Sequence, residues 1–174
     1  MCLRILTTVL SLAALSSCNS RRTPSVDPAT LQTPVAEAVL RYTIEHCPKR
    51  KEAKVAVIGI GEYLAQPTPE FVARFKDIAD LKFVEHRSVV AGMVQGKSRR
   101  YVEETKEPVL ELQIGNLTES KDGRLEAVAA WAFMDDAERK RLEVNPKTGG
   151  GYDIKVLENI PVSNRNDDRR DAGK

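Results

Sequence analysis

VLELQIGNL, residues 109–117, alternates apolar with polar side chains at nearly every position. A period of two is the pattern of a β-strand that buries one face and leaves the other outside the core. RLEAVAAWAFM, residues 124–134, shows the same period, and the turn residues Lys121-Asp122-Gly123 separate the two stretches. The pair predicts a hairpin whose apolar face carries Leu110, Leu112, Ile114, Leu125, Ala127, Ala129, Trp131 and Phe133.

Two helices and a buried strand are predicted upstream of this hairpin. Thr33-Pro34 suits an N-cap and the first helical position, and the helical apolar spacing that follows continues to Cys47, before Pro48. KVAVIGIG, residues 54–61, is nearly continuous in apolar side chains, which is typical of a buried strand. Thr68-Pro69 repeats the helix start and predicts a short second helix with Phe71, Val72, Phe75 and Ile78 on one face.

The remaining segments complete an α+β fold. We expect further strands at residues 81–90 and 152–157, and loops within residues 95–107 and 135–151. A run of neighbouring strands favours an antiparallel sheet of about five strands with two helices packed on one side. EPVLELQIGNL, LEAVAAWAF and GGYDIKVLEN also resemble the three-strand ending of small uncharacterised exported bacterial domains. That resemblance supports the fold and implies no activity.

The N-terminal stretch MCLRILTTVLSLAALSSC has the composition of an export signal. Arg4 supplies the positive charge, and residues 5–15 form an apolar run of eleven residues. Such a run reaches about 16 Å as a helix, against about 30 Å of bilayer hydrocarbon, so it is too short to span. Leu15-Ser16-Ser17-Cys18 resembles the lipobox of bacterial lipoproteins, which implies cleavage before Cys18 and attachment of diacylglycerol to its sulfur. The alternative is an ordinary signal peptide with a coincidental cysteine.

The lipobox resemblance also implies a location. Acyl chains such as palmitate on Cys18 anchor a protein in the cell membrane, and Asn19 in place of aspartate fits an outer membrane, facing the periplasm, in a Gram-negative cell. Residues 19–33 have no apolar period and predict a disordered tether. We therefore divide the chain into signal peptide 1–17, tether 18–33, one α+β domain 34–162 and a charged disordered tail 163–174.

Charge and cysteine content exclude two classes of protein. The chain has 27 basic and 25 acidic residues, and loss of Arg4 with the signal leaves a net charge of +1. A nucleic-acid-binding protein shows a strong basic excess, so we expect no nucleic-acid partner. Cys2 leaves with the signal and Cys18 carries lipid, so Cys47 has no partner for an internal disulfide and the domain depends on packing.

Two candidate sites near glycine and cysteine are weak. Gly59-Ile60-Gly61 follows a strand like a dinucleotide-binding loop, but Leu64 stands where the third glycine would fall, so a turn is the better interpretation. Cys47, with His46 or His86, could form a thiol nucleophile. Its place at a helix C-terminus opposes the thiolate, and core packing explains it better.

Three further candidates involve charge or aromatic side chains. Asp135-Asp136 could bind calcium but lacks the usual loop pattern, so we expect a polar turn. Lys97-Ser98-Arg99-Arg100 with Tyr101 could bind phosphate or an acidic partner, although a solvated hairpin loop is the simpler interpretation. Trp131 and Phe133 could form a binding platform, but aromatic stripes in strands usually belong to the core.

These observations predict a membrane-anchored lipoprotein whose domain binds an envelope protein or polymer without catalysis. Cys18 is the one assigned site, for lipidation, and we expect no cofactor, metal site or catalytic residue. The alternative is an envelope hydrolase whose site is assembled from dispersed carboxylates such as Glu62, Glu70 and Asp135. A concave pocket with converging titratable groups favours an enzyme, whereas a flat exposed apolar patch favours a protein-binding module.

Overall fold

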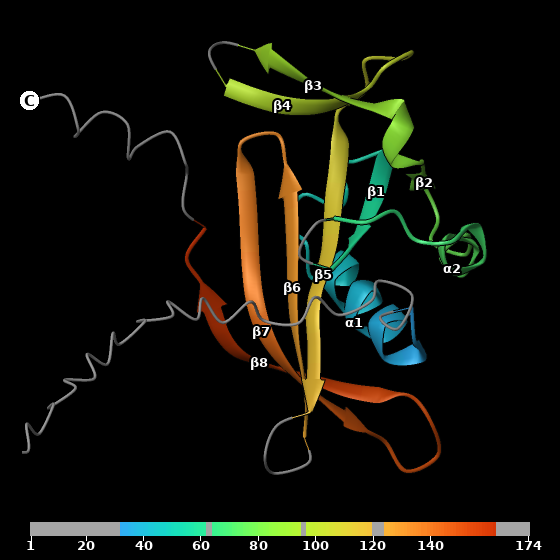
Figure 1. Cartoon of the computed structure of the whole chain (residues 1–174), viewed down its shortest axis with the longest axis vertical. Helices are drawn as coiled ribbons and strands as arrows, with labels where there is room; N and C mark the ends of the chain where they lie inside the picture. Colours follow the sequence, from blue (N-terminus) through green and yellow to red (C-terminus); the bar gives the residue numbers. More distant parts are fainter. Residues whose placement is uncertain (1–31, 62–63, 95–96, 120–123, 163–174) are drawn as a thin grey trace, which may run out of the picture.

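The computed structural model describes residues 32–61, 64–94, 97–119 and 124–162 (Figure 1). The elements of the N-terminal half are α1 (Pro34–Glu45), β1 (Val55–Ile60), α2 (Pro69–Ala73), β2 (Lys82–Phe83) and a short 3-10 helix (His86–Ser88). Those that follow are β3 (Val89–Val94), β4 (Lys97–Val102), β5 (Val109–Glu119), β6 (Leu125–Phe133), β7 (Asp136–Pro146) and β8 (Tyr152–Ile160). The α+β class is therefore confirmed.

The main sheet is mixed and has six strands in the order β2-β1-β5-β6-β7-β8, and β3 and β4 form a separate two-stranded sheet. β1 runs parallel to both β2 and β5, while β5 to β8 form an antiparallel meander. The expectation of a purely antiparallel sheet of about five strands is wrong. Its error lies at β1, because the long segment between β1 and β5 returns the chain to the same end of the sheet before β5 begins.

The hairpin of β5 and β6 is confirmed, with Leu112 opposite Trp131 and Ile114 opposite Ala129. Those four side chains are buried on the face of the sheet that packs against α1. The alternation places Glu111 and Gln113 of β5 on the other face, where Ala132 and Ala130 are their partners in register. The turn Lys121-Asp122-Gly123 lies outside the described residues.

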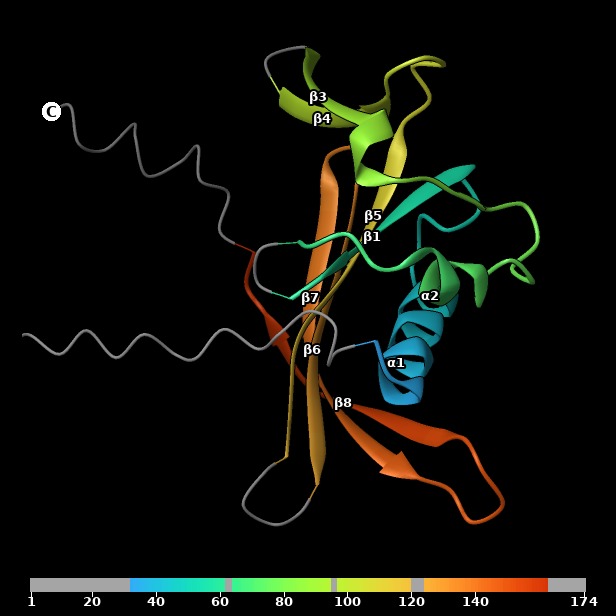
Figure 2. The ribbon, with the colours of Figure 1, turned by 45° about the vertical axis from the view of Figure 1, so that its right-hand side comes forward.

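Both predicted helix starts are confirmed. The backbone N–H of Ala36 donates to Thr33 Oγ1 at 3.2 Å, and that of Phe71 donates to Thr68 Oγ1 at 3.3 Å. α1 lies against one face of the sheet in both ribbon views (Figures 1 and 2). α2 is only five residues long, but Phe71 and Phe75 join the same buried cluster as the apolar side of α1.

β1 is buried along its whole length, as its apolar sequence predicts. Ala56, Ile58 and Ile60 belong to the core under α1. Val55 and Val57 face the other way and pack with Val102 and Val109 in a second, smaller cluster. The β3–β4 sheet lies near the start of β5 (Figure 2). It therefore covers one end of the sheet face opposite α1.

Three segment predictions are wrong. Residues 81–90 do not form one strand, because only Lys82–Phe83 pair with β1 before the 3-10 helix. The basic cluster is not a loop but strand β4, paired with β3 from Val89↔Val102 to Val94↔Lys97. Residues 135–151 are not one long loop, because β7 (Asp136–Pro146) occupies most of them. For β4 and β7, cross-strand pairing overrides weak local patterning.

Cys18, residues 19–31 of the predicted tether and the charged C-terminal tail lie outside the described residues, so their assignments stay predictions. The last two residues assigned to the tether are ordered, because Thr33 caps α1 and Gln32 Oε1 accepts from the backbone N–H of Thr68 at 2.8 Å. Within residues 32–162, as far as they are described, no helix is long and apolar enough to cross a bilayer.

Candidate functional site

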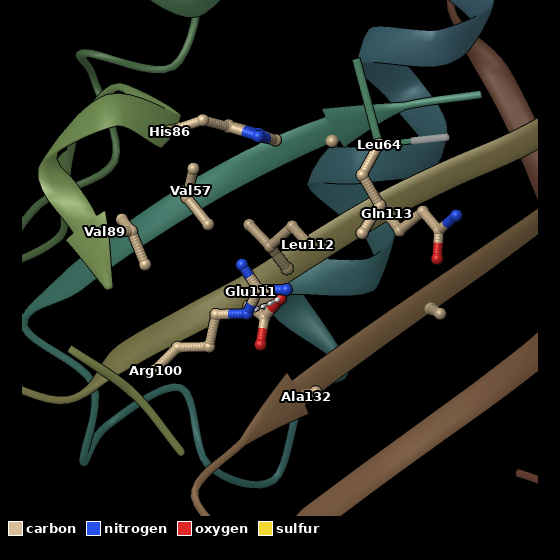
Figure 3. A pocket seen from close by; sticks show the side chains of 11 residues that line it. Val57, Leu64, His86, Val89, Arg100, Glu111, Leu112, Gln113 and Ala132 are labelled. Atoms are coloured by element: carbon tan, nitrogen blue, oxygen red, sulfur yellow. Dashed lines mark ion pairs between the residues drawn. The ribbon is translucent and has the colours of Figure 1, made fainter. Parts of the chain in front are cut away.

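A cavity of about 320 Å³ lies on the sheet face opposite α1. β1, β5 and β6 form its floor, and the 3-10 helix, the start of β3 and β4 flank it (Figure 3). The lining residues are Val57, Gly59, Leu64, His86, Val89, Arg100, Glu111, Leu112, Gln113, Ala130 and Ala132.

Small residues hollow out the floor of the cavity. Gly59 lies on β1 and Ala130 and Ala132 lie on β6, the two strands that flank β5, and none has a side chain larger than a methyl group. Leu64 follows β1 with φ of 54° and packs directly over Gly59. A Cβ at Gly59 would lie 2.7 Å from Leu64 Cδ2, so glycine is required by this close approach. The same contact places Leu64 at one end of the cavity.

An ion pair crosses the cavity from β4 to β5. Arg100 Nε lies 3.2 Å from Glu111 Oε2, and Figure 3 shows the two side chains meeting above β5. The Arg100 side chain is 45% exposed and that of Glu111 is 29% exposed. Burial raises the pKa of the Glu111 carboxyl above its usual range, while the charges of Arg100 and His86 act in the opposite direction. The carboxylate is therefore less readily ionised than an exposed glutamate.

Two further polar side chains in the cavity are oriented by backbone carbonyls. His86 Nε2 donates to the carbonyl oxygen of Ile58 at 2.7 Å, so the hydrogen bond selects the tautomer protonated at Nε2. Gln113 Nε2 donates to the carbonyl oxygen of Gly61 at 3.1 Å, which leaves the amide oxygen as an acceptor. The cavity thus presents a guanidinium, a carboxylate and an amide in fixed positions.

The structure does not assemble the cysteine–histidine site considered from the sequence. Cys47 is 5% exposed and packs in the core under α1, which confirms its packing role, and burial raises the pKa of its thiol. His46 is exposed and donates from Nδ1 to the carbonyl oxygen of Tyr42 at 2.9 Å. His86 lines the cavity on the other face of the sheet. The thiol and His86 therefore lie on opposite faces.

The dispersed carboxylates do not form a site either. Glu70 is exposed on α2, and Asp135 lies in the β6–β7 turn with Oδ2 2.8 Å from Arg99 Nη2. Neither residue lines the cavity. Glu62 lies outside the described residues. The predicted polar turn at Asp135-Asp136 holds only for Asp135, because Asp136 begins β7.

The basic cluster contributes one residue, Arg100, to the lining of the cavity. Adjacent residues of β4 point in different directions, so Arg99 reaches Asp135 while Arg100 reaches Glu111. The acidic partners of these two arginines are thus within the chain itself.

Trp131 and Phe133 are 8% and 4% exposed, which confirms that they belong to the core and form no platform.

Sequence analysis missed Glu111 and Gln113 as site residues. Both were polar positions in an alternating strand, which usually face solvent. The available signal was their neighbourhood: glycine and alanine recur on the matching face of the adjacent strands, and short side chains there leave room for a ligand. That alignment depends on the parallel β1–β5 register, Gly59↔Gln113, which the sequence pattern does not reveal.

Neither a metal site nor a related protein indicates further candidate residues in the part of the chain that the structure describes. No group of three or more histidine, cysteine, aspartate or glutamate side chains within the described ranges could hold a metal ion. Comparisons with protein-family models, with curated proteins and with solved structures found no match to this chain. The function must therefore be argued from the residues of the cavity and of the N-terminus.

Proposed function

We propose that this chain is a membrane-anchored bacterial lipoprotein whose α+β domain binds a small ligand in the cavity between β4, β5 and β6. The lipobox stretch Leu15-Ser16-Ser17-Cys18 supports the anchor, through diacylglycerol on Cys18. Asn19 supports a place in the outer membrane, facing the periplasm, if the cell is Gram-negative. The domain would then display its cavity to solutes of the envelope.

One observation carries the binding function: polar groups of different chemistry converge in a cavity whose floor contains the small residues Gly59, Ala130 and Ala132. About 320 Å³ is at the lower end of ligand-site volumes, so the geometry favours a small molecule. The large apolar side chains that are exposed in the described part of the chain come from four separate segments. They are on β3, in the β6–β7 turn, on β8 and after it, at Met93, Met134, Leu157 and Val162. A small-ligand site therefore has better support than a flat protein-docking surface.

The enzymatic alternative now rests on Glu111 and His86 in place of the carboxylates first considered. A glutamate with a raised pKa beside a histidine is a common arrangement for proton transfer. However, Glu111 Oε2 is held by Arg100, and His86 Nε2 is held by a backbone carbonyl. No lining residue offers a hydroxyl, thiol or amine nucleophile. Binding is the function that this arrangement supports better.

The anchor is tested by changing Cys18. Cys18→Ser should leave an uncleaved precursor that takes up no label from a fatty-acid analogue, whereas Cys47→Ser should be labelled like the unchanged protein. Equal labelling of the Cys18→Ser variant would rule out lipidation at this residue.

Binding in the cavity is tested without knowing the ligand. The full chain is purified from native membranes and denatured, and the small molecules released are compared by mass spectrometry. Ala130→Leu fills the floor of the cavity and should abolish release of the bound molecule. Ala137→Leu, at an exposed position on the neighbouring strand β7, should not. If both variants release the same molecules as the unchanged protein, the cavity is not the binding site.

A further inference from the structure

The hydrogen-bonding groups of the cavity are not all used within the described part of the chain. Arg100 forms an ion pair there with Glu111, whose Oε2 lies 3.2 Å from Nε, and no described residue accepts a hydrogen bond from either Nη group. Glu111 Oε1 and Gln113 Oε1 likewise accept no hydrogen bond from any described residue. None of these atoms is buried away from solvent. The Arg100 side chain is 45% exposed, and neither Glu111 nor Gln113 contributes to the buried atoms without partners in the described residues, which comprise only Tyr101 Oη. The two Nη groups of Arg100 are thus accessible donors, and the Oε1 atoms of Glu111 and Gln113 are accessible acceptors in the same cavity.

We infer that the cavity recognises a small organic carboxylate that carries a hydrogen-bond donor, such as a hydroxyl group, beside the carboxylate. This inference rests on the proposed function and names its class of ligand. The two Nη groups of a guanidinium match the two oxygens of a carboxylate. The donor beside the carboxylate would then meet the acceptor oxygens of Gln113 or Glu111.

Glu111 acts in this arrangement as a positioning residue for Arg100. Its contact with Nε holds the guanidinium over β5, and the Nη groups donate no hydrogen bond to a described residue. Arg100 lies on β4, in the separate two-stranded sheet, and Glu111 lies on β5 of the main sheet. Their ion pair therefore links the two sheets. A carboxylate ligand would extend the pair without breaking it.

An anion fits the cavity better than a cation. A cationic ligand would have to displace Arg100 from Glu111 or lie beside the like charge of the guanidinium. Arg100 is also the more exposed member of the pair, at 45% against 29%. Burial raises the pKa of Glu111, so its negative charge is the one more easily lost. The accessible charge that remains for a ligand is positive.

The floor restricts the body of the ligand. Gly59, Ala130 and Ala132 provide an apolar surface without projecting side chains, and Val57, Val89 and Leu64 surround it. A compact apolar group attached to the carbon beside the carboxylate would rest on this surface. A long or branched polar body would have no partner there.

Three probes of similar shape separate the charge requirement from the shape requirement. Mandelate carries the carboxylate, the hydroxyl and a compact ring; mandelamide is its neutral counterpart; and 2-amino-1-phenylethanol is a cationic one. Saturation-transfer NMR on the full chain in detergent observes each probe directly and gives its dissociation constant by titration. We expect mandelate to bind at least tenfold more tightly than either of the other two.

Variants at two arginines test whether mandelate binds in the cavity. Arg100→Gln should weaken mandelate binding at least tenfold, and Arg100→Lys should weaken it less, because lysine keeps the charge but loses the fork. Arg139→Gln is the matched control, since Arg139 is exposed beside Ala130 on the same face but does not line the cavity. It should change the dissociation constant less than twofold. Urea unfolding midpoints close to that of the unchanged protein would show that each variant is folded.

The outcomes separate this inference from the proposed function. Equal binding of mandelamide, tighter binding of the cationic probe, unchanged binding by Arg100→Gln or no binding of mandelate would each overturn the carboxylate class. If the release experiment still shows a molecule that depends on Ala130, the cavity remains the binding site and only the ligand class is wrong. If that experiment also fails, the binding function is wrong as well.

Discussion

Truncation of Leu112 to alanine tests whether the α1 face of β5 is the main core of this protein. Leu112 is 1% exposed and lies opposite Trp131 in the register of β5 and β6. The change removes three carbons, worth about 2.4 kcal/mol at about 0.8 kcal/mol for each buried methylene. The cavity left behind adds to this cost, so we expect a total loss of about 3–4 kcal/mol in the free energy of unfolding.

Urea unfolding followed by tryptophan fluorescence measures this loss, because Trp131 is the single tryptophan and is 8% exposed. With an m-value of about 1.5 kcal/mol/M, the midpoint should fall by about 2 M. Leu157→Ala removes the same three carbons from a side chain on β8 that is 39% exposed, and should cost less than about 1 kcal/mol. Similar midpoints for the two variants, or a loss below about 1 kcal/mol for Leu112→Ala, would refute the assignment of faces.

Three other changes test particular contacts. Gly59→Ala should destabilise the protein by about 1–3 kcal/mol in the same assay, because the new methyl group meets Leu64 at 2.7 Å; an unchanged midpoint would show that the turn relaxes freely. Burial raises the pKa of Glu111, so the folded state is favoured by protonation and this stability is lost as pH rises through the folded pKa. Glu111→Gln should therefore unfold at higher urea than the unchanged protein at pH 8, with a smaller difference toward pH 4, and the opposite trend would contradict the burial argument. Cys47→Ala should cost about 1 kcal/mol or more, and the native thiol should react slowly with a maleimide, since rapid modification would show that Cys47 is accessible.

The patterns that predicted the fold correctly are local. Thr33-Pro34 and Thr68-Pro69 start helices because a threonine oxygen accepts from a backbone N–H three residues on, which needs no distant partner. The alternation in residues 109–117 and 124–134 identifies the core-facing side chains of β5 and β6, because burial of one strand face imposes a period of two. Cys47 is buried where the helical period places it.

The segments that were predicted wrongly depend on backbone pairing with other strands. β4 carries a basic sequence with little β pattern, and it is a strand because β3 pairs with it. β2 is only two residues long and lies at the edge of the sheet, paired with β1. β7 is long and charged, yet it lies between β6 and β8, whose backbones satisfy its hydrogen-bonding groups on both sides. Side-chain patterns do not record such backbone pairing.

The candidate site divides in the same way. The sequence by itself determined that β1 is buried on both faces and that one face of β5 and β6 is core. The export signal and lipobox before the domain stay predictions from the sequence. Only the tertiary structure decided that Gly59 lies beside Gln113, that Arg100 reaches Glu111 from a separate sheet, and that the resulting hollow is bounded by Leu64. The physical reason is that a cavity requires register between strands far apart in the chain, and register is set by packing across the whole sheet.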